Sequence, residues 1–293
     1  MGRVDIDDEF DDDEIVQNPD EVKVINAVKV TGRSQKGLGV GVLNAITENT
    51  YATIRDTVTG ETSKVKTEPL TNYNVFVIDQ EFNKNSFVSF VNTNVLREGY
   101  FRDANVSSLV FSLANRANSY RLSGDGSMSN ISEDGENESG FASRLDFEKT
   151  KGQIRYSLRH RFADDTYDKN DLGFQRTNNF NDIRGNVSYR IFEPTKHFNF
   201  LRVSFFAGHF RRFKPSVTTS NYTQIDIFAT NLKQLSYGLE LGTNIGERVD
   251  FFEPRTEGRF WKRNGQYRGE GFFSSDFRKR LAFEVALQYR GRY

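Results

Sequence analysis

Histidines that could activate a nucleophile are limited to His160, His197 and His209. Only His209 has neighbours that invite comparison with a catalytic base, because Phe210 and Arg211 follow it directly. No triad order and no glycine-flanked turn exposing a serine accompanies it in the sequence. The chain has no cysteine, which removes thiolate catalysis, disulfides and zinc–thiolate sites. We therefore predict that the protein is not an enzyme and that its histidines are structural or interfacial.

The N-terminal segment is acidic, with carboxylates at most positions from Asp5 to Glu14. Calcium takes about six to eight oxygen ligands, but no glycine interrupts this run as in an EF-hand loop. We expect a solvated acidic segment over residues 1–21, either an extracellular loop or disordered, and no metal or other cofactor. The polar tract at residues 123–140 is interpreted in a similar way, as a strand end and a polar loop.

Carboxylates and arginines share one face of two neighbouring predicted strands. Asp146 and Glu148 lie on the first strand, and Arg155, Arg159 and Arg161 lie on the second, after a tight turn. A carboxylate pair could hydrolyse a glycosidic bond, but only in a cleft that sets its spacing. Opposite charges on facing strands more simply form a cross-strand ladder. We predict that these residues form a charged ladder that faces the lumen of a barrel.

The composition favours a protein that spans a membrane with strands and not with helices. Hydrophobic residues make up 36% of the chain, and no apolar run approaches the roughly 18 residues of a membrane-spanning helix. A spanning strand needs apolar residues only at alternate positions. The 27 Phe and 12 Tyr favour strands and membrane interfaces. The 40 basic and 40 acidic residues cancel, so we expect no nucleic-acid partner.

Apolar and polar residues alternate from residue 22 onward, most clearly where Ile154 and Leu158 interleave with Arg155 and Arg159. Short and long connections also alternate, as in barrels with two unlike rims. The short ones are expected near residues 34–37, 83–85, 116–118, 150–152, 193–197, 231–233 and 262–266. The longer ones are expected near residues 56–61, 98–105, 130–139, 163–181, 212–221, 246–255 and 274–279. This pattern gives roughly fifteen long strands, an odd number that predicts a missing upstream strand.

Four motifs resemble a known family. They are Gly41-Val42-Leu43-Asn44-Ala45-Ile46-Thr47, Glu68-Pro69-Leu70-Thr71-Asn72-Tyr73-Asn74-Val75, Asn92-Thr93-Asn94-Val95 and Asp103-Ala104-Asn105-Val106. The family is the barrel domain of unknown function that follows a carbohydrate-binding family-nine-like domain in Gram-negative envelope proteins. The similarity is densest over residues 22–125 and continues more weakly to the C-terminus.

The resemblance implies an outer-membrane location, contact with outer-membrane lipid, and an N-terminal module through which glycans are bound. It also implies further barrel after Tyr293, and it carries no assigned active-site residues. Because neither the module nor that extension is in this sequence, we expect a fragment or an alternatively started reading frame.

These observations predict an all-β fold, an antiparallel transmembrane β-barrel over residues 22–293 that is incomplete at both ends. The expected function is a non-enzymatic outer-membrane barrel domain, linked to glycan binding or passage by the resemblance alone. Two alternatives stay open. A soluble β-sandwich or adhesin-like binding module shows the same alternation, and an outer-membrane hydrolase is the other.

Overall fold

The computed structural model describes residues 13–256 and 258–292. They form a 14-stranded antiparallel sheet, a three-stranded sheet of order β1-β4-β5 and a two-stranded ribbon, β16-β17. The large sheet contains β2 (Val24–Arg33), β3 (Leu38–Thr47), β6 (Thr71–Phe82), β7 (Ser86–Arg97), β8 (Asp103–Ala114), β9 (Tyr120–Glu133), β10 (Glu136–Lys149), β11 (Ile154–Ala163), β12 (Phe180–Ile191), β13 (Phe198–Arg212), β14 (Val217–Asn231), β15 (Ser236–Ile245), β18 (Gln266–Ser274) and β19 (Glu284–Arg292). The small sheets contain β1 (Asp13–Gln17), β4 (Thr50–Asp56), β5 (Thr62–Glu68), β16 (Arg248–Asp250) and β17 (Trp261–Arg263).

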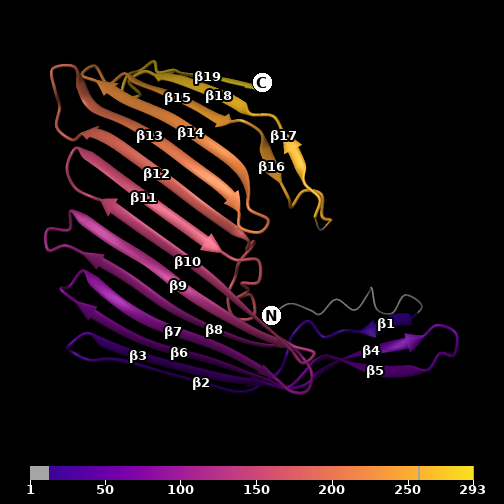
Figure 1. Ribbon diagram of the computed structural model, residues 1–293. Coiled ribbons are helices and arrows are strands. Elements are labelled where there is room, and N and C mark those ends of the chain that lie inside the picture. The colour runs from indigo at the N-terminus through magenta and orange to yellow at the C-terminus, as the bar shows by residue number, and fades with distance from the viewer. Residues whose placement is uncertain (1–12, 257, 293) are drawn as a thin grey trace.

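The large sheet has the order β19-β18-β15-β14-β13-β12-β11-β10-β9-β8-β7-β6-β3-β2, so β2 and β19 are its two edges. Figure 1 shows a curved sheet with β2 at the bottom and β19 at the top, while the three-stranded sheet projects from its lower right. The expected all-β fold with a large antiparallel sheet is therefore confirmed. Within the described residues no helix is long and apolar enough to cross a membrane.

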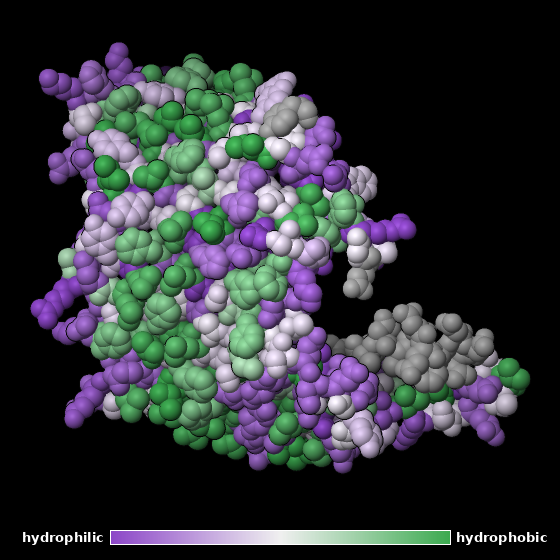
Figure 2. All heavy atoms as spheres, in the orientation of Figure 1, coloured by the Kyte–Doolittle hydropathy of each residue, from purple (hydrophilic) through white to green (hydrophobic). Residues whose placement is uncertain are grey.

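The alternation of the sequence gives each side of the large sheet its own chemistry. On β11, Ile154 and Leu158 are 53% and 54% exposed on one side, whereas Arg159 and Arg161 contact carboxylates on the other. We call these sides the apolar face and the polar face. Hydrophobic side chains gather over the strands in Figure 2, and hydrophilic ones dominate the turns at its left. Exposed members of the apolar face include Val30, Val42, Ile78, Phe90, Leu109, Leu145, Ile183, Phe205, Ile225, Leu241 and Leu287.

Part of the polar face is covered by the chain itself. The connection between β11 and β12, residues 164–179, folds against β9 and β10, where Tyr167 is only 3% exposed. Asp168 N donates to Ser129 Oγ over 3.1 Å. Gly140 permits the approach, since a Cβ atom there would lie 2.3 Å from the backbone of Tyr167.

Several connections differ from the sequence-based expectation. Asp134 and Gly135 alone join β9 to β10, with φ angles of 51° and 81° as a type I′ turn requires. The long connection expected at residues 130–139 is therefore wrong, and the polar tract at 123–140 is almost entirely strand. Polar residues at both strand ends hid the alternation there.

The strand count also differs. The short connection expected at residues 262–266 is present at residues 264–265, but the strand before it, β17, pairs with β16 in the ribbon and adds no strand to the large sheet. The large sheet therefore has 14 strands. Because this number is even, the strand count no longer predicts a missing upstream strand.

The acidic segment contributes one strand. Residues 13–17 form β1, which pairs with β4, and Ile15 packs against the buried pair Ala52 and Ile54. Residues 1–12, and with them the calcium alternative, lie outside the described residues.

Replacing Gly140 by Val should displace residues 164–179, because the added side chain meets backbone that cannot move without unpacking Tyr167. Overpacking of this kind costs about 1–3 kcal/mol, so trypsin should cleave after Lys169 roughly tenfold faster. Gly126→Val is the matched control, since a Cβ atom at Gly126 meets nothing within 4 Å. Equal cleavage rates in the two variants would contradict this packing.

Candidate functional site

Asp146 on β10 is the centre of a charged cluster on the polar face, and it is only 6% exposed. The strand register places it directly opposite Arg159 on β11. Arg159 Nε donates to its carboxylate, and Arg144 Nε lies 3.6 Å from it. Arg144 also contacts Asp125 on β9 at 2.9 Å. Two half-buried arginines thus share one buried carboxylate, which fixes their positions across three strands.

Asp182 on β12 is the centre of a second cluster and is 5% exposed. Arg161 Nη2 donates to Asp182 Oδ2 over 2.5 Å, and Arg184 Nη2 lies 3.4 Å from the same oxygen. The Nε atoms of Arg161 and Arg184 are buried and have no hydrogen-bond partner among the described residues. One carboxylate therefore serves two guanidinium groups and leaves donors unsatisfied on both.

The predicted ladder is only partly assembled. Asp146, Arg159 and Arg161 belong to the two clusters. Arg155 lies near the opposite end of β11, where its Nε donates to Gly152 O over 3.2 Å and its guanidinium covers the Phe192 ring at 4.9 Å. Glu148 lies opposite Arg121 and Ser157 but makes no ion pair within the part of the chain that is described.

Sequence reasoning did not single out four participants. Their only signal is alternation with apolar neighbours, as at Asp182 and Arg184 around Ile183. The residues missed are Asp125, Arg144, Asp182 and Arg184.

A third cluster ties residues 164–179 to the polar face. Arg97 Nη2 lies 2.8 Å from Asp171 Oδ1, and Arg102 contacts Asp168 at 2.7 Å and Asp171 at 3.1 Å. Burial lowers the pKa of Arg102, but attraction and hydrogen bonds from Asp171 and Asp168 outweigh it and raise that pKa above its ordinary value. Arg102 therefore stays charged and holds the connection in place.

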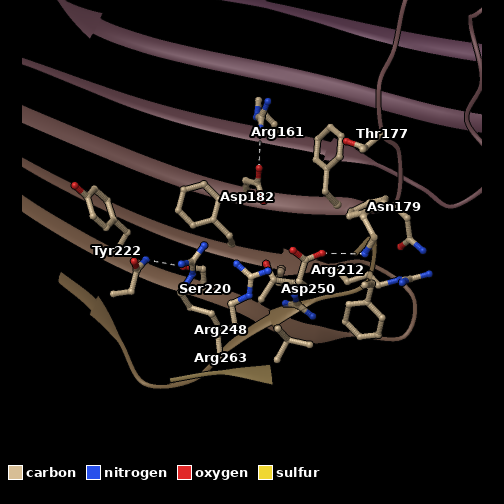
Figure 3. Close-up of a pocket in the computed structure, with 18 of the residues that line it drawn as sticks. Arg161, Thr177, Asn179, Asp182, Arg212, Ser220, Tyr222, Arg248, Asp250 and Arg263 are labelled. Carbon is tan, nitrogen blue, oxygen red and sulfur yellow. Dashed lines mark hydrogen bonds and ion pairs between the residues drawn. The ribbon is translucent and has the colours of Figure 1, made fainter. Parts of the chain in front are cut away.

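A pocket of about 500 Å³ opens at the end of the polar face where β11 to β15 meet the β16–β17 ribbon. Figure 3 shows Arg161, Asp182 and Tyr222 on the large sheet facing Arg248 and Arg263 of the ribbon. Residues 177–179 close a further side. No single segment could form this pocket, because its walls come from strands and connections far apart in the sequence.

Two of the three histidines, His160 and His209, pair with amides of neighbouring strands on the apolar face. His160 Nε2 lies 2.9 Å from Asn181 Oδ1, and His209 Nδ1 lies 2.7 Å from Asn221 Oδ1. In residues 13–256 and 258–292 no group of three or more His, Asp or Glu side chains is placed to hold a metal ion.

The motifs that carried the family resemblance meet in the fold. Asn44 lies opposite Asn74, Asn74 opposite Asn94, and Asn94 opposite Asn105, which makes one row across β3, β6, β7 and β8. Asn44 Nδ2 donates to Asn74 Oδ1 over 2.8 Å. This asparagine row lies on the apolar face, close to the strand ends.

The fold and its two faces define a class, an all-β protein built on one large antiparallel sheet with an apolar and a polar face. The chain belongs to the family described as a domain of unknown function (DUF5916), which matches residues 2–292. The expected membership of a family of unknown function is therefore confirmed. Searches of curated proteins and of solved structures gave no match.

Replacing Asp182 by Asn should destabilise the protein, because Arg161 and Arg184 lose their shared carboxylate. Breaking a fully buried pair costs about 3–5 kcal/mol. The two arginine side chains are 35% and 33% exposed, so solvent screening reduces the expected loss to about 1–3 kcal/mol. The midpoint of urea unfolding, followed by tryptophan fluorescence, measures it.

The matched control is Glu48→Gln, which removes a carboxylate from an exposed pair with Lys23. Its midpoint should equal that of the parent protein. A midpoint for Asp182→Asn that matches this control would show that the cluster contributes nothing to stability.

Proposed function

We propose that the protein is a non-enzymatic β-barrel domain of the Gram-negative outer membrane, with the apolar face against lipid and the polar face lining a lumen. The observation that carries this proposal is the continuous exposed apolar face of the large sheet, from Val30 on β2 to Leu287 on β19. Soluble monomers rarely expose contiguous apolar patches beyond a few hundred Å². Lipid would cover this face in a barrel.

A soluble β-sandwich is the main rival, and it would bury such a face against a second sheet about 10 Å away. Among the described strands, those outside the large sheet form only the three-stranded sheet and the ribbon. The strands also favour the barrel, since β13 and β14 have 15 residues each and spanning strands need about 9–11.

The two ends of the apolar face support the membrane setting. Near one rim Tyr120 stacks on Phe147 with ring centroids 6.2 Å apart, and Phe147 lies 6.2 Å from Tyr156. Aromatic residues of this kind form girdles where barrels meet the lipid interface. At the other rim the asparagine row lies where polar headgroups would meet the strands.

The polar face supports binding or passage of hydrophilic solutes, since its arginines, carboxylates and amides would line the lumen. Glycans enter the proposal through the family resemblance alone. The absence of enzymatic activity remains part of the proposal, supported by the amide partners of His160 and His209.

Single-cysteine variants test the orientation directly, and the chain has no native cysteine to add background. In liposomes a lipid-soluble maleimide should label Ile154→Cys and Leu158→Cys several-fold faster than Arg155→Cys and Arg159→Cys. A membrane-impermeant maleimide should show the reverse order, because alternate residues face opposite sides of the wall. Labelling of all four in urea controls for intrinsic reactivity.

Preferential labelling of positions 155 and 159 by the lipid-soluble reagent would contradict the proposed orientation. Full solubility of the folded parent protein without detergent would favour the sandwich or adhesin-like module instead.

A further inference from the structure

The pocket beside the ribbon carries an excess of positive charge. Its two carboxylates are already engaged, Asp182 by two arginines and Asp250 by the backbone N–H groups of Phe252 and Glu253 at 2.9 and 3.2 Å. The lining arginines are Arg161, Arg184, Arg211, Arg212, Arg248 and Arg263. Most of this charge therefore lacks a carboxylate partner within the described chain, and an anionic ligand would neutralise it.

The ribbon places two like charges face to face. Arg248 and Arg263 occupy directly opposed positions of β16 and β17, and both line the pocket. Like charges in opposed positions destabilise a strand pair. An oxyanion between them would convert this repulsion into two charge-assisted hydrogen bonds.

Aromatic rings hold several of the guanidinium groups in fixed positions. Arg184 covers Phe210 at 4.8 Å, and Arg212 covers Phe251 at 4.4 Å. Arg161 covers Phe180 at 5.0 Å. The cost of ordering long side chains on binding is thereby reduced.

The rest of the wall combines aromatic rings, those of Phe180, Phe210, Phe251 and Phe252, with uncharged polar side chains. Asn244 Nδ2 donates to Ser220 Oγ over 3.0 Å, and Thr177, Thr219 and Tyr222 add hydroxyl groups. The volume of about 500 Å³ falls in the range of small-molecule sites and far exceeds that of a bare ion. A ligand with one oxyanion group and a hydroxylated body would pair the oxyanion with the arginines and its hydroxyl groups with these amide and hydroxyl side chains.

We propose that this pocket binds a saccharide that carries a phosphate or sulfate ester, with the ester held between the ribbon and the large sheet. Arg248 and Arg263 contact the ester from one side, and Arg161 and Arg184 contact it from the other. The inference deepens the proposed function and rests on it for its setting at the mouth of a lumen.

The sole tryptophan, Trp261, provides the readout because Arg263 lies 5.7 Å from its ring. The purified full chain in detergent micelles is titrated with glucose 6-phosphate, glucose 6-sulfate, glucose and inorganic phosphate. A saturable fluorescence change is expected with at least one ester. That ester should bind at least about tenfold more tightly than glucose or inorganic phosphate, and the comparison of the two esters identifies the preferred oxyanion.

The double variant Arg248→Gln/Arg263→Gln should weaken ester binding at least about tenfold. Lys262→Gln is the matched control, because Lys262 lies on the same ribbon, pairs with Glu247 at 3.1 Å and does not line the pocket. Calorimetry repeats each titration, since loss of Arg263 shifts the fluorescence of Trp261 by itself.

The inference is overturned if neither ester binds, if glucose binds as tightly as both esters, or if Lys262→Gln weakens binding as much as the double variant does. Maleimide labelling of Leu158→Cys in liposomes separates the two proposals. Strong lipid-side labelling without ester binding overturns the pocket alone, whereas ester binding without such labelling overturns the membrane setting.

Discussion

The ladder of backbone hydrogen bonds that joins 14 strands into one sheet is the interaction on which the rest of the structure depends. Because side chains alternate along a strand, a register shift by one residue would exchange its two faces. The observed register brings Asp146 opposite Arg159 and Phe147 opposite Leu158. Charged residues thus meet charged residues on the polar face, while apolar residues meet on the apolar face and stay exposed.

Charge on the polar face must be compensated within that face, because the sheet is one layer thick. Asp146 and Asp182 each pair with two arginines, which costs less than leaving these buried carboxylates unpaired. Toward the ribbon this compensation ends, and Arg248 faces Arg263 without a carboxylate partner in the described residues. Arginines that are paired with carboxylates and arginines that could bind an anion therefore lie on the same face of the protein.

The long connections give this surface its shape. Residues 164–179 fold back over β9 and β10, anchored by Arg97 and Arg102, and the β16–β17 ribbon folds toward β14. Both arise at the same rim, opposite the rim of the turn at 150–153. A rigid sheet that positions loops at one end is the usual setting of a binding site.

The sequence by itself determined the all-β class, the two unlike faces and the strand that carries Arg159 and Arg161, because a period of two residues is a local property of the chain. It did not reveal the Asp134–Gly135 turn, since polar residues surround it and no apolar alternation marks its strands. The tertiary structure alone decided that Arg161 pairs with Asp182, that Arg155 does not join the cluster, and that asparagines of neighbouring strands form one row. These contacts depend on strand register and on the path of long connections, which are set by the packing of segments distant in sequence and leave no local periodic signal.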